Sequence, residues 1–210
     1  MNQKFVSKSN FVLRKVLNSD KNLDIIKDFL ESILNIKIIS IRLNPYLKSK
    51  EKCLPEEENF GIADVRVKTD LKEEYNIGIQ FVDGIYVQNK IFLYYAQIHS
   101  NQLEYFNNTK IVKTITINIL DYEYFEDLQY HKKILIQDKK ESKEGEIELH
   151  IIELPKFEVS NLEKLTYEEE WLLYFKERNS KNIKSIINRS LYIKKLDILL
   201  DEFWRREKME

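Results

Sequence analysis

Apolar and polar positions follow two different periods along the chain, and the changes of period mark the expected elements. Residues 22–34 place apolar side chains three and four positions apart, which predicts an amphipathic helix. Residues 37–43 are rich in β-branched side chains and stop at Asn44-Pro45, which predicts a strand followed by a turn. Residues 48–59 are charged and aperiodic, and we expect a surface loop there.

The rest of the pattern predicts more strands, one long helix and a helical end. Residues 62–68 and 75–82 are strand-like and are joined by the polar segment TDLKEE, which favours a hairpin. Residues 88–105 predict a long helix, and the β-branched run 112–120 predicts a central strand. Strands are expected at 132–137 and 147–154, followed by helices from Ser160, which forms a capping box with Glu163. The order indicates a mixed α/β fold.

Composition narrows the class of protein. Apolar residues make up 43% of the 210, with only 4 Gly and 3 Pro, so we expect a folded chain with one core. The net charge of −1 lacks the basic excess of proteins that coat DNA, so nucleic-acid contacts require a local patch. Cys53 is the single cysteine, which favours a reducing compartment, and we expect a cytoplasmic protein. Neither a signal peptide nor a membrane span is expected.

The hairpin carries the strongest candidate for chemistry. Asp64 stands between apolar neighbours on its strand, where a carboxylate is costly unless it is paired or binds a metal. An Asp on the solvent-exposed face of an alternating strand would explain it equally well. Asn76, Gly78 and Gln80 share one face of the next strand, and this face should meet Asp64. A glycine inside a strand is unfavourable, so Gly78 requires an explanation.

These two strands resemble a known signature. GIADVRVK and NIGIQ are similar to the D…(N/D)IEIQ motif of the recombination-promoting nuclease family, a branch of the PD-(D/E)XK superfamily that includes putative transposases. Further segments resemble that family along almost the whole chain, namely SNFVLRKVL, LESILNIKIISIRLNPYL, NKIFLYYAQIHSNQL, ITINILDYEYF, IELHIIELPKF and EEEWLLYF. The resemblance implies a restriction-endonuclease-like mixed β-sheet flanked by helices over residues 1–158, with a C-terminal helical extension over residues 159–210. Members of the family often continue beyond the position of Glu210.

The same resemblance assigns roles to residues. Asp64 would bind Mg²⁺, and Gln80, in the usual place of Lys, would orient the attacked phosphate or the water. The family Glu falls on Gly78, so Mg²⁺ binding and cleavage are expected to be impaired. Arg14 and Lys90 stand at positively charged family positions and would contact the DNA backbone beside Asp64. Restoring the carboxylate with Gly78→Glu is expected to raise Mg²⁺-dependent cleavage.

No neighbouring carboxylate is expected to replace the missing Glu. Glu74 lies four residues away on the same face, roughly 13 Å at the spacing of a strand. Glu73 and Asp83 should point to the opposite face unless the strand bulges. Glu31 on the helix at 22–34 stays open as a contributor, because many enzymes of this superfamily carry an acidic residue on the first core helix.

The resemblance therefore implies a divergent DNA nuclease or putative transposase that acts in recombination by metal-dependent phosphodiester hydrolysis. The first alternative is a catalytically inactive DNA-binding or regulatory homologue, which forms a homo-oligomer or pairs with an active relative. A degenerate remnant of a mobile element is the other alternative. His99, His131 and His150 are scattered without ligand spacing, so we expect surface or core histidines and no zinc site. Tyr94, Tyr95 and Tyr105 on the predicted long helix are expected to belong to the core rather than to stack on bases.

Overall fold

The computed structural model describes residues 11–44, 61–82, 87–105, 111–136, 146–178, 180 and 183–207. The predicted surface loop at 48–59, with Cys53, and Asp83 lie outside these residues. Residues 11–17 form a first helix, followed by a 3₁₀ turn, η1 (Asp20–Asn22). The strands are β1 (Ile38–Leu43), β2 (Ala63–Thr69), β3 (Glu74–Val82), β4 (Lys113–Leu120), β5 (His131–Ile136) and β6 (Ile147–Glu153). The helices are α2 (Leu23–Leu34), α4 (Val87–Tyr105), α5 (Tyr167–Glu177), α6 (Lys184–Arg189) and α7 (Leu191–Glu207), and a 3₁₀ turn, η2 (Leu154–Lys156), follows β6.

The six strands form one mixed sheet in the order β1-β2-β3-β4-β6-β5. β1, β2 and β3 are antiparallel neighbours, β3 and β6 both run parallel to β4, and β5 is antiparallel to β6. The predicted hairpin of β2 and β3 is confirmed, and so is the central place of β4. A parallel pair needs a crossover, and α4 supplies it between β3 and β4.

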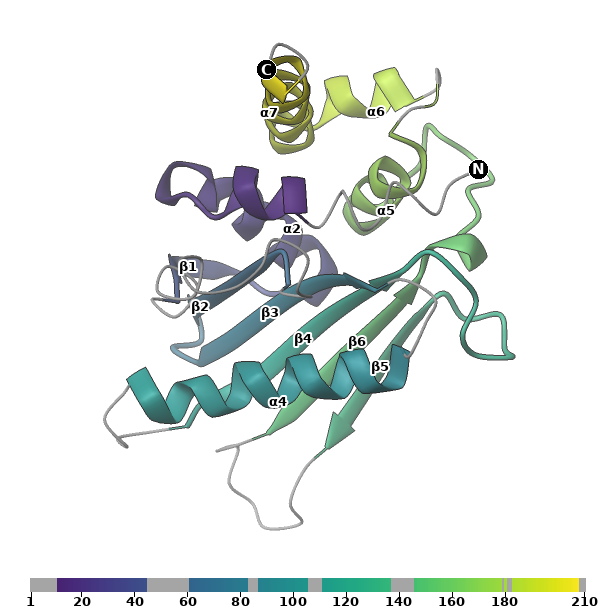
Figure 1. The fold of residues 1–210 in the computed structure, drawn as a ribbon. Helices are drawn as coiled ribbons and strands as arrows, with labels where there is room; N and C mark the ends of the chain where they lie inside the picture. Colours follow the sequence, from purple (N-terminus) through teal and green to yellow (C-terminus); the bar gives the residue numbers. More distant parts are fainter. Residues whose placement is uncertain are drawn as a thin grey trace.

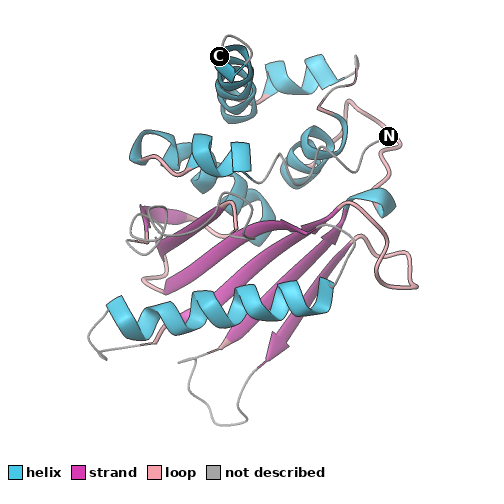
Figure 2. Cartoon of the chain, in the orientation of Figure 1, coloured by secondary structure: helices cyan, strands magenta, loops and turns pink. Residues whose placement is uncertain are grey.

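Helices cover the sheet unequally on its two faces. Of the labelled helices, α4 alone lies across one face, while α2, α5, α6 and α7 gather on the other side (Figures 1 and 2). The larger apolar cluster joins Ile77 and Ile79 of β3 to Phe29 of α2, Trp171 of α5 and Leu196 of α7. The α4 face has a much smaller cluster of Val82, Ile91, Leu120 and Ile151. Most apolar stabilisation therefore comes from the helix-rich face.

The C-terminal helices share this core with the first half of the chain. Asp28 of α2 accepts hydrogen bonds from the Tyr167 hydroxyl and, at 3.0 Å, from the Trp171 indole of α5. Burial raises the pKa of Asp28, although both hydrogen bonds act in the opposite direction. A division of the chain after residue 158 stays a prediction, and residues from both sides of it pack into one apolar cluster.

One predicted helix start was wrong. The capping box lies at Thr166 and Glu169, where the Thr166 hydroxyl accepts from the Glu169 amide and the Glu169 carboxylate accepts from the Thr166 amide. Ser160 and Glu163, which have the same spacing, lie in a turn. The apolar residues that begin at Trp171 are buried against α2. The helix therefore starts at the Thr166 capping box, which directly precedes them, and not at the Ser160 one. No helix among the described residues is long and apolar enough to cross a membrane.

Candidate active site

The register of β2 and β3 places the candidate residues on one face of the sheet. Asp64 lies directly opposite Gly78 in the antiparallel pair, and Gln80 follows Gly78 by two positions. Directly opposed residues and residues two apart share a face, so Asp64, Gly78 and Gln80 all project toward α4. The predicted antiparallel pairing is confirmed, and the common face follows from the register.

Asp64 is buried in a way that does not favour folding. Its side chain is 1% exposed. One carboxylate oxygen, Oδ1, accepts a hydrogen bond from the Asn44 amide, while Oδ2 has no hydrogen-bond partner among the described residues. Burial raises the pKa of Asp64 to about 7, against the opposing effect of the Asn44 hydrogen bond. A buried carboxylate with an unpaired oxygen costs stability, which is typical of a residue retained for chemistry rather than for the fold.

Polar side chains from β2, β3 and β4, and from the residue that follows β1, continue the site along the α4 face. We call Asn44, Asp64, Asn76, Gln80, Thr116 and Asn118 the polar layer. Asn44 donates to Asn76 at 2.6 Å, and Gln80 donates to Asn118 at 2.7 Å. Asn118 in turn donates to the Thr116 hydroxyl at 3.1 Å. The Gln80 amide nitrogen is thus bound to β4.

Sequence reasoning missed part of this layer. Asn44 was interpreted only as the end of a strand, but it lies 20 residues before Asp64 and contacts it across the β1–β2 pair. Asn118 was missed although a signal was present. In β4, Thr114, Thr116 and Asn118 alternate with isoleucines, and this period of two marks a polar face.

Gly78 is explained by a tyrosine of α4. A Cβ atom at Gly78 would lie 2.8 Å from the Tyr94 hydroxyl and 3.0 Å from Cγ1 of Ile98, and a Cβ atom at Gly61 would lie 2.0 Å from that hydroxyl. The Tyr94 hydroxyl hydrogen-bonds to the carbonyls of Ala63 and Ile79, each at 3.1 Å. Both glycines therefore make room for one buried ring, as predicted for a core tyrosine. The ring occupies the space into which a side chain at position 78 would extend.

A scan against protein-family models decides the family of this chain. The model described as PD-(D/E)XK nuclease family transposase matches residues 7–209. This chain belongs to that family. The mixed six-stranded sheet with flanking helices fits the PD-(D/E)XK nuclease fold. Searches of curated proteins and of solved structures each gave no match.

PD-(D/E)XK nucleases generally depend on a divalent metal, and in this chain the polar layer would have to supply its ligands. A divalent ion requires several oxygen ligands, and Mg²⁺ prefers six in an octahedron. Asp64 supplies the one carboxylate of the polar layer, and its side chain is almost completely buried. No three His, Cys, Asp or Glu side chains in the described ranges form a group that would hold a metal ion. The described residues, as arranged, do not fit the metal of a PD-(D/E)XK nuclease.

The structure separates several predicted contributors from Asp64. Glu31 accepts a hydrogen bond from the Ile38 amide at 2.6 Å, so its carboxylate closes the start of β1. Ile38 pairs with Thr69, at the end of β2 remote from Asp64. Arg14 lies on the helix at 11–17, whose buried apolar residues join the larger cluster on the far face of the sheet from Asp64.

Lys90 lies instead in the first turn of α4, on the Asp64 face of the sheet. The two basic residues are therefore carried on opposite faces. Their predicted joint contact with DNA phosphate beside Asp64 stays a prediction.

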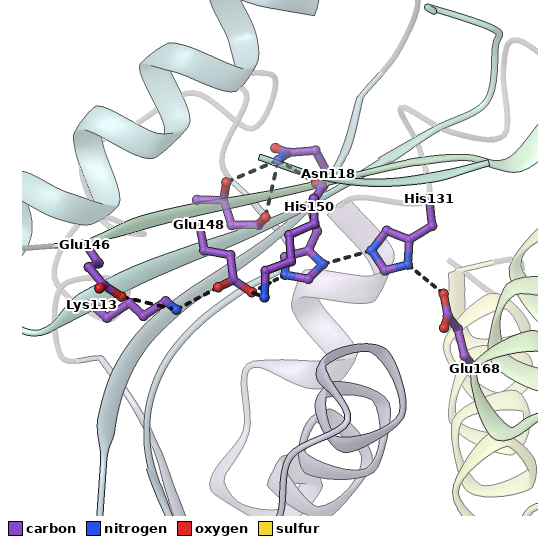
Figure 3. Close-up of polar contacts among 9 residues, drawn as sticks. Lys113, Asn118, His131, Glu146, Glu148, His150 and Glu168 are labelled. Atoms are coloured by element: carbon purple, nitrogen blue, oxygen red, sulfur yellow. Dashed lines mark hydrogen bonds and ion pairs between the residues drawn. The ribbon is translucent and has the colours of Figure 1, made fainter. Parts of the chain in front are cut away.

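A second group of polar side chains lies on the face of the sheet away from Asp64. The pairing of β5 with β6 brings together two histidines that the sequence suggested were scattered. His131 Nε2 and His150 Nδ1 are 2.8 Å apart, His150 Nε2 lies 2.7 Å from Glu148, and His131 Nδ1 lies 2.8 Å from Glu168 (Figure 3). Glu168 belongs to α5, so this histidine chain connects the sheet edge to the helical layer.

Charged neighbours surround the histidine chain. Burial alone would raise the pKa of Glu148, but hydrogen bonds from His150, Lys113 and Lys133 outweigh it and hold this pKa well below its usual range. Burial lowers the pKa of His150. These contacts give the group a structural role in joining β6 and β5 to α5.

Proposed function

We propose that this chain is a divergent PD-(D/E)XK transposase-family protein that acts on DNA in recombination and whose metal-dependent phosphodiester hydrolysis is impaired. One observation carries the proposal: Gly78 stands opposite Asp64 where the family motif has Glu, and Tyr94 fills the adjoining space. The family acts on DNA, and the resemblance to the family motif supports Asp64 as its Asp, which is buried at a cost to folding at neutral pH.

The side chains as placed support impaired rather than efficient hydrolysis. We assign Asp64 as the metal ligand and Gln80 as the group that orients phosphate or water, on the basis of the family motif. Asp64 is covered, and the Gln80 amide is engaged with Asn118. Both side chains would have to be uncovered or reoriented before they met a phosphodiester.

A cleavage assay with plasmid and single-stranded DNA in Mg²⁺ or Mn²⁺ tests the proposal. We expect little cleavage by the wild-type chain. Gly78→Glu alone should add little, because even its Cβ would collide with Tyr94 and Ile98. The double variant Gly78→Glu with Tyr94→Ala provides both the carboxylate and the space, and it should raise metal-dependent cleavage.

Two matched variants make this test specific. Gly78→Gln with Tyr94→Ala has the same shape without the charge and should stay inactive, and Asp64→Asn added to the active pair should abolish cleavage. Strong wild-type cleavage that survives Asp64→Asn would show that the site lies elsewhere. Strong wild-type cleavage that requires Asp64 would contradict the proposed impairment, because another carboxylate would then complete the site.

The alternative function is DNA binding without cleavage, and the burial of Asp64 favours it over efficient catalysis. Arg14→Ala or Lys90→Ala should each weaken DNA binding and lower the salt dependence by about one unit of slope if that side chain contacts a phosphate. Lys164→Ala, an exposed control before α5, should leave both unchanged. If the chain binds DNA without cleaving it, we infer that it pairs with an active relative or with a second copy. Its single cysteine favours the reducing conditions of the cytoplasm.

A further inference from the structure

The outer surface of α4 carries an apolar stripe. Phe92 is 60% exposed, Leu93 70% and Leu103 48%, and the smaller Ala96 and Ser100 between them are exposed too. Between Lys90 and Glu104 the helix contains no Asp, Glu, Lys or Arg, in a chain of which 33% of residues are charged. A solvated helix face in such a chain would carry charges, whereas the buried centre of a protein interface is depleted in them.

Apart from Phe92, the stripe is arranged symmetrically around one residue of α4. A helix turns by about 100° per residue, so Leu93, Ala96, Ser100 and Leu103 fall within an arc of roughly 80°. The middle of this arc lies opposite Ile98, which is buried against the sheet. Leu93 and Leu103 are each five residues from Ile98, and Ala96 and Ser100 are each two residues from it. Large side chains thus stand at both ends, and small ones at the centre.

We propose that this stripe is a self-association surface, on which a second copy of the chain docks its own α4 in antiparallel orientation about a two-fold axis at the level of Ile98. That axis places Leu93 of each copy against Leu103 of the other, and Ala96 against Ser100. The small central pair lets the helices approach, while the leucines pack at the ends. A two-fold contact must be self-complementary in this way, whereas an unrelated partner would impose no match of size about Ile98.

The placement of α4 in the fold permits this contact. Among the labelled helices it lies alone on its face of the sheet, so its outer surface projects away from the rest of the described chain (Figure 1). The stripe from Leu93 to Leu103 is about 15 Å long, which is shorter than a standard protein interface. The dimer is therefore weak and depends on concentration. The inner surface of α4 holds Tyr94 over Gly78, so the helix surface that would pair with a second copy is distinct from the one that faces Asp64.

Sedimentation of the full chain over a range of concentrations tests the proposal. The wild-type chain should show a monomer–dimer equilibrium. Leu93→Glu and Leu103→Lys should each weaken it by about tenfold or more, because each places a charge against an apolar side chain. The two changes combined in one chain should restore the dimer, since the new carboxylate at position 93 then meets the new ammonium at position 103 of the other copy. The same two groups are about 15 Å apart within one helix and cannot pair there.

A control and three outcomes decide the result. Leu71→Glu introduces the same charge at a residue that is 76% exposed in the turn between β2 and β3, and it should leave the equilibrium unchanged. Thermal unfolding checks that each variant stays folded, as exposed positions allow. A wild-type chain that is monomeric at every concentration would overturn the proposal. So would a dimer that persists in Leu93→Glu, or a double variant that stays as weak as the single ones.

Discussion

Asp64→Asn should stabilise the metal-free protein, and the gain should depend on pH. In the folded chain the Asp64 carboxyl has a pKa of about 7, compared with 3.8 when it is unperturbed. At a pH between these two pKa values, the Asp64 carboxyl is protonated more often in the folded state than in the unfolded state. The contribution of Asp64 to stability is therefore fully present below about pH 4 and is lost as pH rises through 7.

The magnitude follows from the shift. A difference of about three pKa units corresponds to about 4 kcal/mol of folding free energy, and the side chain is too buried for solvent to screen it. Asparagine has nearly the same shape and never ionises. Its amide can also donate a hydrogen bond to Asn44 Oδ1, which has no partner in the part of the wild-type chain that the structure describes. Asp64→Asn should therefore raise the free energy of unfolding by about 4 kcal/mol at pH 8 and by little at pH 4.

Urea unfolding in EDTA at pH 4, 6 and 8 measures this difference between the two chains. Every other titrating group is common to both, so it cancels in the comparison. Asp70→Asn, at an exposed aspartate in the hairpin turn, serves as the control and should change stability little at any of the three pH values. Equal stability at pH 8, or a difference that does not grow with pH, would refute the argument that Asp64 is buried and ionises at the expense of the fold.

Four further changes test other contacts by urea unfolding. Tyr94→Phe removes both hydrogen bonds to strand carbonyls and should lower the free energy of unfolding by about 1–3 kcal/mol, so an unchanged value would contradict the structure. Gly61→Ala puts a Cβ 2.0 Å from the Tyr94 hydroxyl and should cost about 2 kcal/mol or more; a tolerated alanine would argue against that close contact. Asp28→Ala leaves the buried Trp171 indole N–H unpaired and removes one acceptor from the exposed Tyr167 hydroxyl, so it should cost about 2 kcal/mol, with Asp24→Ala, which removes an exposed ion pair with Lys195, as the comparison. Glu148→Gln should destabilise at pH 7 and still at pH 4, because the stability provided by a lowered pKa is complete above the ordinary pKa of Glu and is lost only as pH falls through the pKa of the folded group; a loss that has already vanished at pH 4 would refute this.

The sequence by itself determined the elements and the faces of the strands. Alternation in the hairpin was enough to place Asp64 and Gln80 on one face, because the direction of a strand side chain is a local property. The same alternation in β4 marks Thr116 and Asn118 as polar neighbours. The resemblance to the family motif added the prediction that Gly78 stands in the place of the family Glu.

Only the tertiary structure decided which distant side chains meet. Asn44 reaches Asp64 through the β1–β2 register, and His131 reaches His150 through the register of the antiparallel β5–β6 pair. Tyr94 lies against Gly78 because α4 packs on the sheet with Tyr94 and Ile98 directly over that position of β3. Periodicity fixes which face a residue points from, but register and helix docking depend on packing over the whole core, which no local pattern encodes.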